Sequence, residues 1–322
     1  MKILVTGGAG FIGSHLVDKL LKDNHLVCVI DNLNDYYDPL IKLHNLKSAK
    51  NNKNFIFYQV DIENINNLKD VFNKHNFDVV VHLAARAGVS PSLINPTDYM
   101  NTNVLGTVNI LECMREYSVS KIVVASSSSV YGNCSANIFS ENLKVSEPIS
   151  PYAASKIACE QICYTWHYLY NINTVALRFF TVYGPRQRPD LAISKFTSLI
   201  DKGLPIEMYG DGTSVRDYTY IDDIISGVIS SIEYSKSSYE VINLGGGAPI
   251  SLIEMIKSIE EELNKKAVII RREMQQGDVK KTACDTSKAR ILLNYVPQFC
   301  FKDGLHRFIE WKRKTDLELN LV

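Results

Sequence analysis

The stretch Thr6-Gly7-Gly8-Ala9-Gly10-Phe11-Ile12-Gly13 decides the fold. It follows an apolar run, Ile3–Thr6, that is expected to be a strand, and it leads into Gly13–Lys22, whose apolar residues have helical spacing. Three glycines at this spacing permit a tight turn, close approach of the backbone to a pyrophosphate, and close packing of helix on strand. Strand, glycine-rich turn and helix in this order predict a dinucleotide-binding βαβ unit.

A carboxylate at the end of the second expected strand favours one cofactor. Asp31 directly follows the apolar run Val27–Ile30. At that place it can accept hydrogen bonds from the ribose hydroxyls of adenosine, and it would repel a 2′-phosphate. NAD is therefore expected rather than NADP, and the alternative interpretation of Asp31 is an exposed turn aspartate.

Alternating apolar runs and helical segments extend this unit through the first half of the chain. Further strands are expected at Phe55–Gln59, Val79–Leu83 and Ile122–Ser126, and helices at Ile65–Lys74 and Tyr99–Tyr117. Such alternation produces right-handed crossovers. The fold class is therefore α/β, with a doubly wound parallel sheet of the Rossmann type.

The second half predicts a smaller α/β domain. Glu240–Leu244 is expected to be a further strand, and Ser251 with Glu254 forms a capping box that opens a helix through Leu263. Ligands of doubly wound sheets bind beyond the carboxyl ends of the strands, so this region is expected to close over that edge as the substrate-binding domain.

We expect a discontinuous division of the chain. The NAD-binding domain is placed at residues 1–180 plus 217–245, and the smaller substrate-binding domain at residues 181–216 plus 246–322.

Composition argues against several classes of function. Lysine plus arginine and aspartate plus glutamate both number 35, so no basic face for nucleic acid or for an anionic membrane is expected. No run approaches the ~18 apolar residues of a membrane span, and the chain enters a strand at once, without room for a signal peptide. The seven cysteines include no Cys-x-x-Cys pair, which favours thiols in a reducing cytoplasm over a zinc site or disulfides.

A tyrosine and a lysine have the spacing of a catalytic pair. Tyr152 and Lys156 lie one turn apart on a predicted helix, and an ammonium group beside a phenol favours the phenolate, which can act as a base. Such a pair also occurs by chance on solvated helices. The strand Ile122–Ser126 runs into hydroxyls that extend to Ser129, which could hold a sugar oxygen or merely cap the next helix.

Taken together, these motifs resemble those of the extended short-chain dehydrogenase/reductase superfamily, over essentially the whole chain. The segments that match, in the order found in that family, are TGGAGFIGS (6–14), Asp31-Asn32-Leu33, Asp61-Ile62, His82-Leu83-Ala84-Ala85, SSSSVYG (126–132) and YAASK (152–156).

The resemblance implies a catalytic triad of Ser127, Tyr152 and Lys156. It also implies a set of residues that contact NAD: Gly7, Gly10, Phe11, Ile12, Gly13, Asp31, Asn32, Lys42, Asp61, Ile62, Leu83, Ala84, Ala85, Tyr152 and Lys156.

The residues after Ser127 indicate the reaction. Relatives that dehydrate or decarboxylate a sugar usually carry an acidic residue there, whereas this chain has Ser128 and Ser129. Simple 4-epimerisation is therefore expected. Tyr152 would take the proton of the sugar's 4-hydroxyl while C4 passes hydride to NAD, and the 4-keto sugar would then recover the hydride on its other face.

The segment Arg178–Asp190 indicates the sugar, because it is similar to the signature of UDP-glucuronate 4-epimerases. By that similarity Arg188 grips the C5 carboxylate, for which a guanidinium group offers two parallel hydrogen bonds, and Thr181 helps to orient it. The alternative is that Arg186 and Arg188 bind only phosphate or acidic surface residues. The implied substrate contacts are Ser127, Ser128, Ser129, Thr181, Arg188, Lys195, Arg216 and Asp278.

Two other functions stay open at this stage. One is a UDP-glucose or UDP-N-acetylglucosamine 4-epimerase with the same triad. The other is a non-catalytic NAD-binding scaffold or sensor, against which the intact triad argues.

A homodimer is also expected. The helices at Tyr99–Tyr117 and Tyr152–Tyr170 are apolar around more of their circumference than one sheet can cover, which predicts pairing in a four-helix bundle. The residues that extend their apolar surface include Val104, Leu111, Ile157, Ile162 and Trp166.

Overall fold

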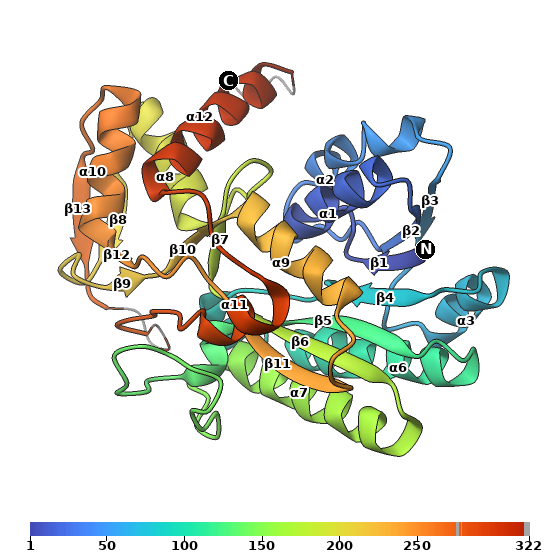
Figure 1. Cartoon of the computed structure of the whole chain (residues 1–322). Helices are drawn as coiled ribbons and strands as arrows, with labels where there is room; N and C mark the ends of the chain where they lie inside the picture. Colours follow the sequence, from blue (N-terminus) through green and yellow to red (C-terminus); the bar gives the residue numbers. More distant parts are fainter. Residues whose placement is uncertain (275–276, 278, 319–322) are drawn as a thin grey trace.

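The largest element of the computed structural model is a seven-stranded parallel sheet (Figure 1). The structure describes residues 1–274, 277 and 279–318. The order of the strands in the sheet is β11-β6-β5-β4-β1-β2-β3. From β1 the chain first adds strands on one side, β2 and β3, and then adds the later strands on the other side, starting with β4. These strands are β1 (Lys2–Thr6), β2 (Leu26–Asp31), β3 (Phe55–Gln59), β4 (Val79–His82), β5 (Lys121–Ser127), β6 (Asn173–Phe179) and β11 (Tyr239–Leu244). The predicted doubly wound sheet is confirmed.

Helices cover both faces of this sheet (Figure 1). They are α1 (Phe11–Lys22), α2 (Pro39–Asn45), α3 (Ile65–Lys74), α4 (Val89–Ile94), α5 (Pro96–Tyr99), α6 (Gly106–Glu116), α7 (Pro151–Tyr170) and α9 (Ile221–Glu233), with short turns η1 (Ala49–Asn51) and η3 (Ser128–Tyr131). On β1, Ile3 and Val5 belong to the apolar core on one face, which includes residues of α1 and α9, whereas Leu4 belongs to the core on the other face. Burial on both faces is why the strands are continuously apolar.

The prediction of a single continuous helix at Tyr99–Tyr117 was wrong, because the segment divides into successive helical turns of different type. The chain forms α5, then a wider π-helical turn, η2 (Met100–Leu105), and then α6. Within the wide turn the carbonyl oxygen of Asn103 accepts hydrogen bonds from the Thr107 hydroxyl and the Cys159 thiol. The turn thereby ties α6 to α7.

Among the described residues, the second half of the chain adds three two-stranded sheets and further helices, most of which lie together at one side of the large sheet (Figure 1). The sheets pair β7 (Thr181–Tyr183) with β10 (Tyr218–Tyr220), β8 (Ile206–Tyr209) with β13 (Ile269–Arg272), and β9 (Val215–Arg216) with β12 (Ile250–Ser251). The helices are α8 (Ala192–Asp201), α10 (Leu252–Leu263), α11 (Ser287–Leu293) and α12 (Phe301–Glu318).

The capping box that opens α10 is confirmed. The hydroxyl oxygen of Ser251 accepts from the amide of Glu254, and the Glu254 carboxylate accepts from the amide of Ser251. The predicted division of the chain into two domains stays a prediction, although the strands of the large sheet all lie within 1–180 plus 217–245.

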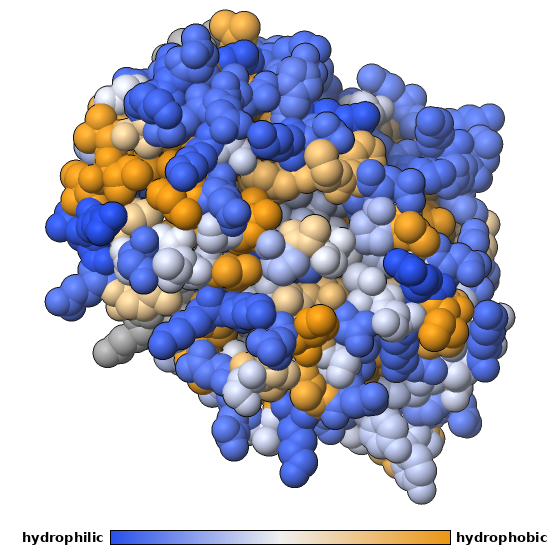
Figure 2. Space-filling model, turned by 60° about the vertical axis from the view of Figure 1, so that its left-hand side comes forward, coloured by the Kyte–Doolittle hydropathy of each residue, from blue (hydrophilic) through white to orange (hydrophobic). Residues whose placement is uncertain are grey.

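Hydrophobic side chains form separate patches on an otherwise largely hydrophilic face (Figure 2). Within the described part of the chain, no helix has both the length and the apolar character needed to cross a bilayer. All seven cysteines are free thiols. Most of them are buried, and Cys300 is exposed.

Candidate active site

A cavity of about 460 Å³ lies at the carboxyl ends of β1, β4 and β5. Its walls come from both halves of the chain: the glycine-rich turn after β1, the serines after β5, the start of α7, and the segment from Phe179 to Leu191. This is the edge of a doubly wound sheet at which ligands bind.

Two glycines of the glycine-rich turn leave no room for a side chain. Gly7 has φ +69°, and a Cβ added there would lie 2.7 Å from the amide nitrogen of Ala84. A Cβ on Gly13 would lie 2.2 Å from the carbonyl oxygen of Gly7. Helix α1 then begins at Phe11 without a side-chain cap. Its first N–H groups and positive dipole end suit a pyrophosphate, so the turn fits a dinucleotide.

Asp31 lies buried behind this turn, with only 8% of its surface exposed. Its carboxylate accepts hydrogen bonds from the amides of Ala9 (3.1 Å) and Leu33 (2.9 Å). Burial raises the pKa of Asp31, while those amides and the nearby Lys42 oppose the rise. The Lys42 ammonium lies 4.8 Å from the centre of the Tyr37 ring and donates to Asn34.

Most of the predicted cofactor residues line the cavity. They are Gly7, Gly10, Phe11, Ile12, Gly13, Asp31, Asn32, Lys42, Ile62, Leu83, Ala84, Ala85, Tyr152 and Lys156. Asp61 does not line the cavity but contacts a residue that does: its carboxylate accepts a hydrogen bond from the side-chain amide of Asn32 at 2.8 Å. Sequence reasoning missed Tyr36 and Tyr37, which also line the cavity; two adjacent aromatic residues soon after Asp31 were the available signal.

The three residues of the predicted triad line the same cavity. Ser150 caps α7 by accepting from the amide of Ala153, and Pro151 is the first residue of the helix, so Tyr152 lies in its first turn. Lys156 is buried and its ammonium donates to the carbonyl oxygen of Ala125 at 2.8 Å.

The serines after β5 form a hydroxyl cluster. The Ser127 hydroxyl oxygen accepts from both the amide (3.2 Å) and the hydroxyl (2.9 Å) of Ser129. Ser128 and Ser129 also line the cavity, so no carboxylate stands directly after Ser127.

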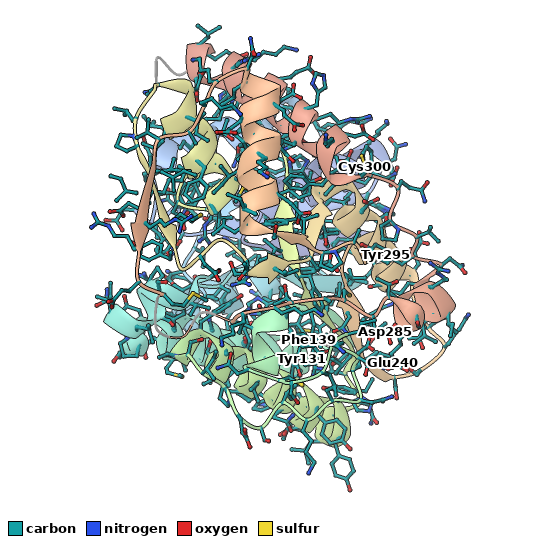
Figure 3. All side chains as sticks on the ribbon, turned by 90° about the vertical axis from the view of Figure 1, so that its left-hand side faces the viewer. Tyr131, Phe139, Glu240, Asp285, Tyr295 and Cys300 are labelled. Atoms are coloured by element: carbon teal, nitrogen blue, oxygen red, sulfur yellow. The ribbon has the colours of Figure 1, made fainter. Side chains whose placement is uncertain are left out.

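A buried polar network, missed by sequence reasoning, supports the end of β5. Arg178 on β6 and Glu160 on α7 form an ion pair at 2.7 Å, and both are almost fully buried. Ser126 donates to Glu160, and Arg178 donates to the Tyr131 hydroxyl at 3.0 Å. Figure 3 shows Tyr131 beside Phe139, with ring centres 5.0 Å apart. The network thus holds Ser126, directly before Ser127, and Tyr131, four residues after it.

The predicted substrate residues are placed unequally. Thr181, Arg188 and Arg216 line the cavity with the serines. Lys195 is an exposed residue of α8 and does not line it. Asp278 lies outside the described residues.

The two arginines of the loop after β7 face different partners. Arg188 pairs with Asp190 through two hydrogen bonds of 3.0 and 2.7 Å, and its guanidinium lies 5.1 Å from the centre of the Tyr36 ring. Arg186 pairs with Asp18 of α1 at 2.6 Å. In this structure each arginine thus binds an acidic residue, but only Arg188 lines the cavity.

Comparisons with known proteins find relatives that match nearly the whole chain. A family model described as GDP-mannose 4,6 dehydratase matches residues 4–308. The UDP-glucuronate 4-epimerase of Thermodesulfobacterium geofontis (strain OPF15) is 46% identical over 317 residues, which cover 98% of this chain and 97% of that protein.

Solved structures of similar proteins include two epimerases. The UDP-glucuronic acid 4-epimerase of Bacillus cereus, in complex with UDP-glucuronic acid and NAD, superimposes with a TM-score of 0.93 at 38% identity, covering 98% of this chain and 100% of that one. The UDP-glucose 4-epimerase of Thermotoga maritima, with UDP-glucose, gives a TM-score of 0.90 at 33% identity, covering 98% and 99%.

Proposed function

The chain belongs to the extended short-chain dehydrogenase/reductases, in the family that the GDP-mannose 4,6 dehydratase model describes, and we propose that it is an NAD-dependent UDP-glucuronate 4-epimerase. It interconverts UDP-glucuronate and UDP-galacturonate through a 4-keto intermediate. The observation that carries this proposal is that Ser127, Tyr152, Lys156 and Arg188 line one cavity together with the dinucleotide turn.

Tyr152 acts as the base for the 4-hydroxyl of the sugar. Lys156 lies one turn further along α7 and lines the same cavity, and its ammonium donates to the carbonyl oxygen of Ala125. Ser127 orients the sugar oxygen by a hydrogen bond. When bound against the glycine-rich turn and Asp31, NAD would supply the acceptor for the C4 hydride.

The residues after Ser127 support epimerisation over dehydration. Removal of water from the sugar needs a further acid or base near C5 and C6, and Ser128 and Ser129 offer only hydroxyls there. The 4-keto sugar therefore has one productive outcome in the closed site, which is return of the hydride to either face of C4.

Arg188 and Thr181 hold the C5 carboxylate. The guanidinium group of Arg188 already donates two hydrogen bonds to one carboxylate, that of Asp190. The carboxylate of the substrate replaces Asp190 at this guanidinium group or binds beside it. The hold matters because the intermediate is a β-keto acid. Decarboxylation becomes possible when the C5–C6 bond lies perpendicular to the plane of the C4 carbonyl. That bond then breaks, CO2 leaves, and the electron pair of the bond forms an enolate with the carbonyl. C5 of the enolate finally takes up a proton.

The diphosphate of UDP is assigned to Arg216, which lines the cavity from β9. Lys195 and Asp278 stay predicted contacts of the nucleotide. Lys195 is exposed on α8, so its contact requires the side chain to extend toward the cavity.

The enzyme is proposed to be a cytoplasmic homodimer with the two-domain division given above. Helix α7 carries an exposed aromatic and aliphatic end, including Tyr164, Tyr168, Leu169 and Tyr170. Pairing of η2–α6 and α7 with the same helices of a second copy buries this surface in a four-helix bundle.

A panel of UDP-sugars tests the function. The purified protein is incubated with UDP-glucuronate, UDP-glucose and UDP-N-acetylglucosamine, and products are resolved by NMR. We expect kcat/KM to be highest for UDP-glucuronate, with UDP-galacturonate as the product. Preference for either neutral sugar would replace the proposal by the corresponding 4-epimerase, and no turnover of any sugar would favour a binding protein.

A further inference from the structure

The loop between β7 and α8 makes an unusual turn. The amide of Gln187 donates to the carbonyl oxygen of Gly184 at 3.1 Å, with Pro185 second and Arg186 third in the turn. Arg186 has φ +64°. A proline followed by a residue with positive φ is the pattern of a type II turn, where the third position favours glycine or asparagine. Here an arginine occupies it.

The side chain of this arginine gives a reason for its presence. The guanidinium of Arg186 contacts the Asp18 carboxylate of α1 at 2.6 Å, and the other Asp18 oxygen accepts from the Ser48 hydroxyl at 3.0 Å. Beside them the ring Nε2–H of His15 donates to the carbonyl oxygen of Pro185 at 2.9 Å. The loop is thus fastened at two successive residues to the helix that begins at the dinucleotide turn.

Arg188 directly follows this turn and faces the cavity. Arg188 is only two residues beyond Arg186, and its guanidinium reaches across to the carbonyl oxygen of Ala87 (3.3 Å) and the ring of Tyr36. Both partners lie in the cavity wall. A loop held at Arg186 has little freedom left at Arg188.

One detail argues that this arrangement serves more than stability. The second guanidinium nitrogen of Arg186, Nη1, is buried and has no hydrogen-bond partner among the described residues. Positive φ in a non-glycine residue and an unsatisfied buried donor are both unfavourable, and such features are usually retained where a site needs a fixed geometry.

We propose that Asp18 and Arg186 form a positioning ion pair that sets the place of Arg188, and through it the orientation of the substrate carboxylate. The inference rests on the proposed function. The pair touches no substrate, and it acts only by fixing the turn. Its expected effect is therefore on the binding and fate of the carboxylate, with the triad and the cofactor turn unaffected.

Arg186→Gly is the primary test, since glycine suits the positive φ and the variant is expected to fold. Asp18→Asn removes the negative charge of the ion pair and leaves a side chain of nearly the same shape. Lys19→Gln is the matched control, because it breaks a surface ion pair with Asp23 on the same helix. For each variant we measure kcat and KM for UDP-glucuronate, the fraction of product that is the decarboxylated 4-ketopentose nucleotide, the bound NAD per chain, and the melting temperature.

In both test variants KM should rise by about tenfold, since small misplacement of a positioning group has effects up to about 10²-fold. The decarboxylated fraction should rise too, with bound NAD as in wild type. The double exchange Asp18→Arg with Arg186→Asp should recover part of the loss. Test variants that match the Lys19→Gln control, or that differ from wild type only in melting temperature, would overturn the inference. Failure of wild type to convert UDP-glucuronate would instead overturn the proposed function.

Discussion

The Lys156 ammonium is fixed by the carbonyl oxygen of Ala125, 2.8 Å away and two residues before Ser127. This bond joins the first turns of α7 to the carboxyl end of β5. The two elements that carry the proposed triad are thus held in one arrangement by the protein itself, and the hydrogen bond from the Ser126 hydroxyl of β5 to the Glu160 carboxylate repeats the connection one turn further along α7. Changes confined to the phenol of Tyr152 should therefore leave the fold intact.

Tyr152→Phe removes only the hydroxyl that acts as the base. Turnover of UDP-glucuronate should fall by about 10²–10⁴-fold, the usual cost of losing a general base. Bound NAD and melting temperature should stay at wild-type values, since the ring still packs against Tyr99. Near-normal turnover in this variant would rule out the assigned mechanism.

Tightly held NAD is the second expectation, because the redox cycle closes on itself. Denaturing the purified protein should release about one NAD per chain, as expected for a single dinucleotide site per chain. The buried Asp31 carboxylate would repel a 2′-phosphate. Recovery of NADP in place of NAD would contradict the role given to Asp31.

The sequence predicted those parts of the fold that depend on local pattern. Most strands of the first half are continuous apolar runs, as expected of a parallel sheet that is covered on both faces. Strand β6 was missed, because it begins close after α7 with no glycine or proline between them. The helix ends at Tyr170, and its cap residue Asn171, with φ +55°, is a weaker stop signal than glycine.

For the site, motifs located the residues but not their partners. Whether Asp61 touches the cavity or only orients Asn32 depends on a side-chain contact that no spacing encodes. The Glu160–Arg178 pair joins a helix to a strand, so it exists only after the chain has folded. Lys195 had the right residue type, but its position on α8 leaves it exposed.

Two histidines, the buried His82 and the half-buried His15, should make the protein less stable in acid. Burial and Lys156 lower the pKa of His82 to about 3, and burial and Arg186 lower that of His15 to about 4, from an ordinary value of 6.5. The unfolded chain therefore binds more protons than the folded one below pH 6.5. Their contribution to stability is fully present above that pH and is lost as the pH falls toward about 4 for His15 and about 3 for His82.

Urea denaturation at several pH values between 7 and 5 measures this effect. Each histidine adds a slope of at most about 1.4 kcal/mol per pH unit to the free energy of unfolding. His15→Gln should make the slope shallower, because its neutral side chain no longer takes up a proton. An unchanged slope in this variant would show that His15 titrates normally in the folded protein.

Arg188→Ala separates the sugar acid from neutral sugars. Loss of a charge-assisted bidentate contact costs about 1.5–3 kcal/mol, or roughly ten- to a hundred-fold in apparent affinity or rate. Turnover of UDP-glucuronate should fall by that factor, with more 4-ketopentose nucleotide, while any residual turnover of UDP-glucose should change less. Equal losses for both sugars would favour the neutral-sugar alternative.

The central claim is that this cavity epimerises UDP-glucuronate at C4 by removing and returning the same hydride. NMR of the wild-type reaction with UDP-glucuronate in D2O tests it most directly. The account predicts that UDP-galacturonate accumulates to equilibrium with hydrogen, not deuterium, at C4, because the hydride never exchanges with solvent. No UDP-galacturonate, or UDP-galacturonate that carries solvent deuterium at C4, would contradict it.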